Sequence, residues 1–169
     1  MSNVILIGYM GCGKSTIGKR ISFLFHMPYI DTDKWIEKEQ NMTVSRIFDE
    51  KGEAAFRDME TACLHAMTEN KQDYIIAVGG GLPMRKENRA LLGKLGTVVY
   101  LRAKPETIYE RLKDDTTRPL LQGEDPFGKI CGMIKQRGPV YEEAADIIVD
   151  VDNKTCETIM REIQEAIQK

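Results

Sequence analysis

The strongest constraint on the fold lies in residues 4–16, where a short apolar run leads directly into a segment rich in glycine. Residues 4–7 read VILI, and a short run of branched apolar residues is typical of a buried β-strand. Residues 8–16 read GYMGCGKST, with three glycines among the first six residues. Because glycine is a poor residue for a strand or a helix interior, this segment indicates a loop whose backbone approaches a ligand closely.

The spacing Gly8-x-x-x-x-Gly13-Lys14-Ser15 is that of a phosphate-binding loop between a strand and a helix. Its glycines allow consecutive N–H groups to point at an anion, and the N-terminus of the following helix adds positive charge. Lys14 is expected to reach the β- and γ-phosphates of a nucleotide, and the Ser15 hydroxyl to bind Mg²⁺. The alternative is a glycine-rich turn that carries an exposed lysine. The predicted nucleotide-binding residues of the loop are Gly11, Cys12, Gly13, Lys14, Ser15 and Thr16.

Apolar strands and helical patterns alternate along the rest of the chain. We expect strands at residues 4–7, 29–30, 74–78, 97–101 and 147–149. We expect helices at residues 14–26, 35–52 with a break near Asn41, 53–70, 85–95, 106–113, 129–137 and 155–168. This alternation predicts an α/β fold: a three-layer α/β/α sandwich with a central parallel sheet of about five strands, of the phosphate-loop NTPase type and nucleoside-monophosphate-kinase-like. With 169 residues and no repeat or linker, we expect a single domain over residues 1–169.

Charge and hydropathy exclude several classes of function. The formal net charge is −2, so the chain has no general basic field that would recruit nucleic acid. The longest apolar runs are a few residues, too short to span a membrane, and a strand that begins by residue 4 leaves no room for a signal peptide. The cysteines lack paired or metal-binding spacing, which favours reduced thiols in a cytoplasmic protein; they are Cys12, Cys63, Cys131 and Cys156.

Three unusual stretches follow expected strands, and a parallel sheet would bring them to the same edge. They are GYMGCGKST, DTD at residues 31–33 and GGG at residues 79–81. Asp31 and Asp33 would point to opposite sides if their strand continued, one toward a metal ion and the other toward a second substrate. The alternatives are a hydrogen-bonded turn before the next helix for the acids, and a tight turn for the glycines.

Three arginines are candidates for binding anionic groups. Arg57 lies near the start of a long helix, and Glu60, three residues on, could pin its guanidinium. Arg118 lies in residues 114–126, which lack a clear period and are predicted to form a mobile lid over the transferring phosphoryl group. Arg137 precedes a predicted break after a helix. The alternative for each arginine is a solvated residue or one that interacts with a helix end.

Taken together, these stretches resemble the shikimate kinase family through nearly the whole chain and in the same order. The matching segments read GYMGCGKSTIGKRIS, DTD, FRDMETACL, GGG, RPLL and RGPVYEEAAD. The phosphate-binding loop is shared by many families, whereas the combination of the other segments is specific. The resemblance implies an enzyme that transfers the γ-phosphoryl group of ATP to a hydroxyl of shikimate, giving shikimate 3-phosphate, in aromatic amino-acid biosynthesis.

The resemblance also implies an acceptor site. Asp33 would bind the shikimate hydroxyls and help to deprotonate the one that attacks. Arg57 and Arg137 would clamp the carboxylate, whose two oxygens match the fork of a guanidinium. The segment over residues 33–60 would supply much of this site. The lining backbone would come from Gly79, Gly80 and Gly81.

On the nucleotide side, the resemblance implies that Arg111 stacks near adenine and that Arg118 comes from the lid to the phosphates. Asp31 would lie near Mg²⁺ through water, in addition to Ser15. The family often places a proline in the loop after the last strand, whereas VDVDNKTCETI has none, which leaves the adenine contacts open. The implied catalytic residues are Lys14, Asp33 and Arg118.

Two rival functions share the phosphate-binding loop. The first is another small-molecule kinase of this fold, acting on gluconate or a nucleoside monophosphate, which would keep the ATP site and change the acceptor pocket. The second is a non-enzymatic nucleotide-binding protein, which would have no acceptor site. For the kinase we expect ATP and shikimate as substrates, Mg²⁺ as cofactor, and a cytoplasmic monomer without nucleic-acid or membrane partners.

Overall fold

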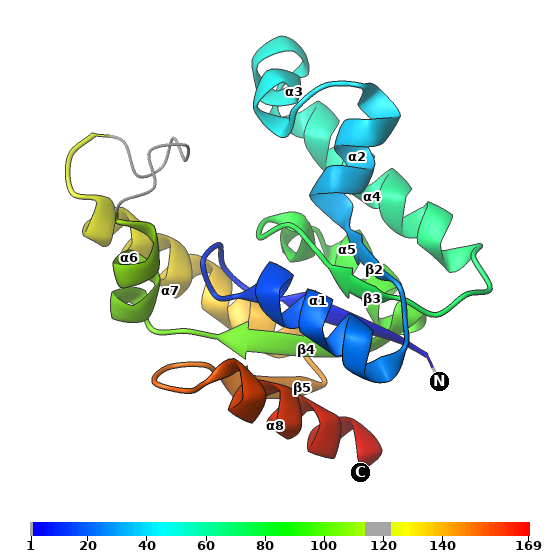
Figure 1. The fold of residues 1–169 in the computed structure, drawn as a ribbon. Helices are drawn as coiled ribbons and strands as arrows, with labels where there is room; N and C mark the ends of the chain where they lie inside the picture. The colour runs from blue at the N-terminus through cyan, green and yellow to red at the C-terminus, as the bar shows by residue number, and fades with distance from the viewer. Residues whose placement is uncertain (1, 114–122) are drawn as a thin grey trace.

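The computed structural model describes residues 2–113 and 123–169, in which a central parallel sheet lies between two layers of helices (Figure 1). The strand order across the sheet is β2-β3-β1-β4-β5, and every neighbouring pair is parallel. The prediction of an α/β fold with about five parallel strands is therefore confirmed. The strands are β1 (Asn3–Ile7), β2 (Tyr29–Asp31), β3 (Ile75–Ala77), β4 (Gly96–Arg102) and β5 (Ile147–Asp150).

β1 occupies the centre of the sheet, and all five of its residues are buried. Val4 is in register with Ile75 of β3 on one side and with Thr97 of β4 on the other. From β1 the chain first builds β2 and β3 on one side and then crosses to β4 and β5 on the other. The carboxyl end of β1 is thus the point where the connections diverge, and open α/β sheets bind ligands at such a point.

Helices cover both faces of this sheet (Figure 1). α1 and α8 contact one another over one face, α5 and α7 contact β4 from the other, and α2 and α3 pack with α4 beyond the β2 edge. The helices are α1 (Lys14–Phe25), α2 (Thr32–Gln40), α3 (Val44–Lys51), α4 (Glu53–Thr68), α5 (Lys86–Leu95), α6 (Pro105–Leu112), α7 (Pro126–Ala144) and α8 (Cys156–Gln168), with the short 3₁₀ helix η1 (Leu82–Met84).

Several helix ends form where the sequence predicts them. The break near Asn41 is real, because Asn41 adopts a left-handed conformation that ends α2. Thr43 caps α3 by accepting a hydrogen bond from the backbone N–H of Arg46, and Gly52 ends that helix with φ of 86°. Pro105 stands at the start of α6, where its missing N–H leaves no helical hydrogen bond unmade.

The predicted end of the helix at Arg137 is wrong, because α7 continues through Pro139 to Ala144. Tertiary contacts outweigh the low helix propensity of Gly138 and Pro139. Tyr141, one turn further on, is buried, packs its ring against Tyr100 and donates a hydrogen bond to the carbonyl of Gly80.

The predicted start of the same helix is also wrong. α7 begins at Pro126, because the Asp125 side chain accepts a hydrogen bond from the N–H of Gly128 and caps the helix. Pro126 therefore belongs to a helix and not to the predicted lid over residues 114–126. Residues 114–122, including Arg118, lie outside the described residues, so the lid stays a prediction.

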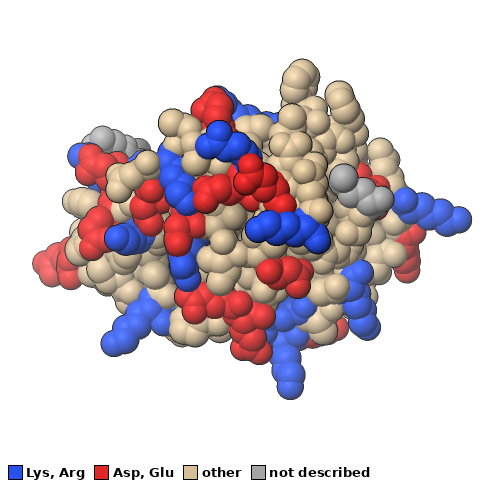
Figure 2. Space-filling view, turned by 90° about the horizontal axis from the view of Figure 1, so that it is seen from below, with Lys and Arg blue, Asp and Glu red and all other residues tan. Residues whose placement is uncertain are grey.

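The surface carries both signs of charge. Figure 2 shows lysine and arginine side chains interspersed with aspartate and glutamate over one face, consistent with the small net charge. Within the described residues, no helix is both long enough and apolar enough to cross a bilayer. All four cysteines are free thiols, as predicted.

Candidate active site

The loop after β1 has the backbone conformation that its glycines permit. Gly11 and Gly13 adopt φ of 80° and 101°, in the left-handed region that other residues rarely enter. A Cβ atom on Gly11 would lie 2.9 Å from Cγ of Leu112, so the loop also needs glycine to pack beneath α6. The loop leads into the N-terminus of α1 at Lys14, which is the arrangement that binds phosphate.

Lys14 folds back over this loop. Its Nζ donates to the carbonyl of Gly8 at 2.5 Å and to that of Tyr9 at 3.3 Å. Ser15 and Thr16, the next two residues, are exposed at the first turn of α1, whereas Cys12 is buried beneath the loop. The ammonium group is therefore held beside the loop at the point where a bound phosphate would need a positive charge.

Arg111 closes the other side of the loop. From α6, its Nη1 donates to the carbonyl of Gly11 at 3.0 Å and lies 3.6 Å from the position of a Cβ atom on Gly13. A groove of about 640 Å³ beside it is lined by residues of α6 and of the loop after β5, among them Thr107 and Asp152. This groove adjoins the phosphate-binding loop, because Arg111 both lines the groove and contacts the loop.

The loop after β5 is anchored without a proline. Asp152 accepts hydrogen bonds from the backbone N–H of Lys104 at 2.9 Å and from the hydroxyl of Thr107 at 2.5 Å. A carboxylate thus ties this loop to the start of α6 and fixes one wall of the groove. These hydrogen bonds of Asp152 were not predicted from the sequence, because Asp152 lies far from both partners along the chain.

The two acids of DTD do not alternate as strand residues, so that expectation is wrong. α2 already begins at Thr32, and Asp31 is its N-cap: Oδ1 of Asp31 accepts from the N–H groups of Asp33 at 2.9 Å and Lys34 at 3.3 Å. The turn considered as the alternative is therefore present. Thr32 is buried, and its hydroxyl accepts a hydrogen bond from the N–H of Gly79, which joins DTD to GGG.

Each glycine of GGG lies against a different charged side chain. A Cβ atom on Gly79 would lie 2.9 Å from Asp33 Oδ1, and one on Gly80 would lie 3.4 Å from Arg137 Nη1. A Cβ atom on Gly81 would lie 2.5 Å from Nη2 of Arg57, closer than such atoms approach one another. Charged side chains therefore pack directly onto the backbone of the three glycines, most closely at Gly79 and Gly81. They bring together the predicted acceptor-binding residues Asp33, Arg57 and Arg137.

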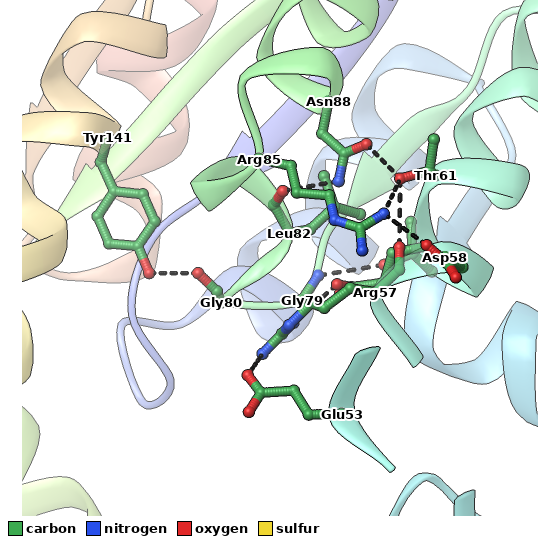
Figure 3. A network of polar contacts seen from close by, with 12 residues as sticks. Glu53, Arg57, Asp58, Thr61, Gly79, Gly80, Leu82, Arg85, Asn88 and Tyr141 are labelled. Atoms are coloured by element: carbon green, nitrogen blue, oxygen red, sulfur yellow. Dashed lines mark hydrogen bonds and ion pairs between the residues drawn. The ribbon is translucent and has the colours of Figure 1, made fainter. Parts of the chain in front are cut away.

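Arg57 is fixed by two carboxylates of its own helix. Its Nη1 lies 2.7 Å from Oε1 of Glu60, and its Nη2 lies 3.3 Å from Oε1 of Glu53. Figure 3 shows the pair of Arg57 and Glu53. The guanidinium also lies 5.5 Å from the centre of the Phe56 ring. The Arg57 side chain is 19% exposed, so the alternative of a freely solvated arginine is wrong.

A second polar network holds the helices behind the triple glycine (Figure 3). The hydroxyl of Thr61 donates to Asn88 Oδ1 at 2.7 Å, and Nδ2 of Asn88 donates to the carbonyl of Leu82 at 2.9 Å. Arg85 Nη1 contacts Asp58 at 2.8 Å. These contacts fix η1, and with it the end of GGG, against α4 and α5.

The acids of this site have perturbed proton affinities. Burial raises the pKa of Asp33 above its ordinary value, and the negative charge of Asp31 raises it further. Burial also raises the pKa of Glu60, to about 7, although the hydrogen bond and charge of Arg57 act in the opposite direction. Such shifts are typical of sites that bind or transfer protons.

The donor set around Ser15 and Asp31 fits a Mg²⁺ ion that is bound mainly by nucleotide and water. Mg²⁺ in kinases takes few protein ligands, and oxygen is the element it prefers. Asp31 uses Oδ1 to cap α2, which leaves Oδ2 for a water ligand. No cluster of three or more acidic, histidine or cysteine residues that could hold a metal by itself occurs in the described part of the chain.

The fold, with its phosphate-binding loop beside the triple glycine, defines a class of protein: a phosphate-loop kinase. Gly8 of the loop and Gly80 of the triple glycine approach closely, since a Cβ atom on Gly80 would lie 3.6 Å from the Gly8 carbonyl oxygen. A model of the shikimate kinase family matches residues 10–168. The chain belongs to the shikimate kinase family.

Relatives of known sequence and structure agree with this assignment. A shikimate kinase of Bacillus mycoides (strain KBAB4) is 43% identical over 169 residues, which cover all of both chains. The structure of shikimate kinase from Acinetobacter baumannii in complex with shikimate superposes with a TM-score of 0.92 at 34% identity, covering 99% of this chain and 93% of that one. A gluconokinase from Sinorhizobium meliloti superposes with a TM-score of 0.57 at 16% identity, covering 99% and 91%, which indicates a shared fold alone.

Proposed function

We propose that this protein transfers the γ-phosphoryl group of ATP to a hydroxyl of shikimate, giving shikimate 3-phosphate. The observation that carries the proposal is the convergence of Asp33, Arg57 and Arg137 on the triple glycine, directly beside the phosphate-binding loop. One acid and two arginines around a single backbone turn suit an acceptor that carries hydroxyl groups at one end and a carboxylate at the other.

The two arginines would orient the acceptor. Arg57 comes from α4 and Arg137 from α7, so they approach the glycines from different elements. A carboxylate between them could accept paired N–H donors, and each charged hydrogen bond contributes about 1.5–3 kcal/mol. This clamp would leave a ring hydroxyl facing Asp33, which would accept its proton as the oxygen attacks phosphorus.

On the nucleotide side, Lys14 would move from the Gly8 carbonyl to the β- and γ-phosphates when ATP binds. Mg²⁺, held by Ser15 and through water by Asp31, would neutralise phosphate charge. Arg111 would lie against adenine at the groove beside α6, and Arg118 of the predicted lid would reach the transferring group. In-line transfer then depends on positioning and on neutralised charge, which these residues supply.

A panel of acceptors tests the proposal. With Mg²⁺ and ATP, ADP should form with shikimate and not with gluconate or AMP. The methyl ester of shikimate, which keeps the ring hydroxyls and loses the negative charge, is the matched control and should react about 10²- to 10⁴-fold more slowly in kcat/KM. Turnover of gluconate or AMP in place of shikimate would assign the pocket to another acceptor, and no turnover with any of the three would favour a non-enzymatic nucleotide-binding protein. We also propose that the enzyme is a monomer and acts in the cytoplasm.

A further inference from the structure

Asn88 on α5 is a fully buried residue that joins three elements behind the candidate acceptor site (Figure 3). Its Oδ1 accepts a hydrogen bond from the hydroxyl of Thr61 on α4 at 2.7 Å, and its Nδ2 donates to the carbonyl of Leu82 in η1 at 2.9 Å. Buried polar groups in folded proteins are hydrogen-bonded, so the amide requires both partners at these places. Asn88 thereby connects α4 to η1 through a chain of short hydrogen bonds.

The two elements that Asn88 connects also carry the two sides of the contact between Arg57 and the triple glycine. Thr61 lies about one helical turn beyond Arg57 on α4, and its hydroxyl is 3.2 Å from the Arg57 carbonyl oxygen. Leu82 directly follows Gly81, where a Cβ atom would lie 2.5 Å from Nη2 of Arg57. The hydrogen bonds of Asn88 therefore run from the same helix to the same turn as the Arg57 contact does.

The next residue of α5, Arg89, also binds η1. Its Nη1 donates to the carbonyls of Pro83 at 2.8 Å and Met84 at 3.0 Å. With the bond from Asn88 to Leu82, the carbonyl oxygen of each η1 residue is bound by a side chain of α5. A single turn of 3₁₀ helix has few hydrogen bonds of its own, and its last carbonyls need outside partners. The position of η1, and of the triple glycine before it, therefore depends on α5.

We propose that Asn88 is a positioning residue for acceptor binding: through Thr61 and Leu82 it holds the triple glycine at the distance from α4 at which Arg57 can meet a carboxylate. Asn88 acts through Arg57 and not on the acceptor directly. Its loss leaves a buried hydroxyl and a carbonyl without this partner and releases η1 from α4. Small displacements of a binding group are costly, so acceptor binding should weaken. The kinetic part of the inference rests on the proposed function, whereas the hold on η1 is tested without substrate.

Three variants test the hydrogen bond itself. Asn88→Leu and Thr61→Val each remove it and nearly keep the size of the side chain. Each should raise the KM for shikimate by about tenfold and leave the KM for ATP within about twofold of the wild type. Thr61→Ser keeps the hydroxyl group and should keep the KM for shikimate within about threefold of the wild type. Equal KM values for shikimate in Thr61→Ser and Thr61→Val would overturn the inference, as would an equal rise in the KM for ATP.

Asn3→Leu is the matched control, because it removes a buried asparagine at the amino ends of the strands, away from the acceptor site. Asn3 donates to the carbonyl of Leu95 at 3.0 Å and accepts from the N–H of Tyr74 at 2.7 Å. Its loss should lower the melting temperature and leave both KM values unchanged. A rise in the KM for shikimate as large as in Asn88→Leu would assign the effect to a general loss of stability and overturn the inference.

A double-mutant cycle tests whether Asn88 acts through Arg57. Residues that act through one another have effects that do not add. In the Arg57→Ala background, Asn88→Leu should therefore change the KM for shikimate by less than about twofold. Thr61→Val takes the place of Asn88→Leu in the cycle if that variant does not fold. A further tenfold rise in the double variant would show that Asn88 acts independently of Arg57 and would overturn the inference.

Hydrogen exchange of backbone N–H groups provides a readout without substrate. The N–H groups of Leu82 and Met84 donate to carbonyls of the triple glycine, both at 3.1 Å. They should exchange at least about tenfold faster in Asn88→Leu than in the wild type, and at the wild-type rate in Asn3→Leu. Unchanged exchange in Asn88→Leu would refute the hold on η1 even if shikimate is turned over. Faster exchange in a protein whose wild type does not turn over shikimate would refute the proposed function alone.

Discussion

The phosphate-binding loop and the acceptor site lie side by side but are built in opposite ways. The loop takes its main residues from one continuous stretch, between Gly8 and Ser15, and its geometry follows from the positive φ of glycines next to a helix start. The acceptor site takes Asp33 from α2, Arg57 from α4 and Arg137 from α7, and gathers them on GGG after β3. The first site is a property of local sequence and the second is a property of the whole fold.

This difference determines what a mutation should do in each region. In the loop, a substitution of Lys14 should remove one contact to a phosphate and leave the surrounding packing as it was. In the candidate acceptor site, polar side chains also hold one another in place: Glu60 pairs with Arg57, and the hydroxyl of Thr32 accepts a hydrogen bond from the N–H of Gly79. Substitutions in this site should change the binding or turnover of the acceptor and have little effect on the binding of ATP.

The largest effect is expected for Lys14→Met, which tests the local site. Loss of the positive charge at the phosphates should lower kcat by about 10³-fold. The fold should persist, because the hydrogen bonds of the ammonium group to Gly8, Tyr9 and Cys12 all lie within the loop itself. Lys19→Met, an exposed lysine of the same helix, is the control. Normal turnover by Lys14→Met, with an unchanged circular dichroism spectrum, would remove the loop from the mechanism.

The same contrast explains how much could be predicted from the sequence. The loop, the fold class and the helix ends at Asn41, Thr43 and Gly52 follow from residues close together in the chain, and the structure confirms them. The spacing of Asp33, Arg57 and Arg137 along the chain does not indicate that they lie together, because the parallel sheet is what brings their elements to one edge. The resemblance to the family is what predicts this grouping.

The errors arise where a distant contact outweighs a local preference. Gly138-Pro139 predicts a helix end, but Tyr141 is held by Tyr100 and by the Gly80 carbonyl, so α7 continues. The packing of both Asp33 and Glu60 onto Gly79 was not predicted, because nothing in the spacing of residues 33, 60 and 79 indicates it.

Asp33→Asn should give the next largest effect and belongs to the site that the fold assembles. An amide cannot take a proton from the attacking hydroxyl, so kcat should fall by about 10²-fold. ATP affinity, measured by nucleotide binding without shikimate, should stay within about twofold of the wild type. If ATP affinity falls instead, Asp33 acts on the metal, and the roles given to Asp31 and Asp33 must be exchanged.

Arg57→Ala should act on the acceptor alone. Losing one charged hydrogen-bonding partner of the carboxylate should raise the KM for shikimate by about 30-fold and leave the KM for ATP near its wild-type value. The control is Arg20→Ala, since Arg20 on α1 pairs with Glu157 on the molecular surface. Equal increases in both KM values would show that Arg57 supports the whole structure, and the contrast between a local and an assembled site would fail.

The smallest effect is expected for Asp31→Asn, at the border between the two sites. Asp31 caps α2 through Oδ1, and asparagine caps helices about as well as aspartate, so the free energy of unfolding should change by a few tenths of a kcal/mol. The lost charge should still raise the Mg²⁺ concentration for half-maximal activity by about fivefold, a modest change because the contact is expected to run through water. Thermal unfolding and a Mg²⁺ titration at saturating ATP separate the two roles. Unchanged Mg²⁺ dependence together with a clear loss of stability would make Asp31 a helix cap and nothing more, and the metal would then depend on Ser15 of the local site.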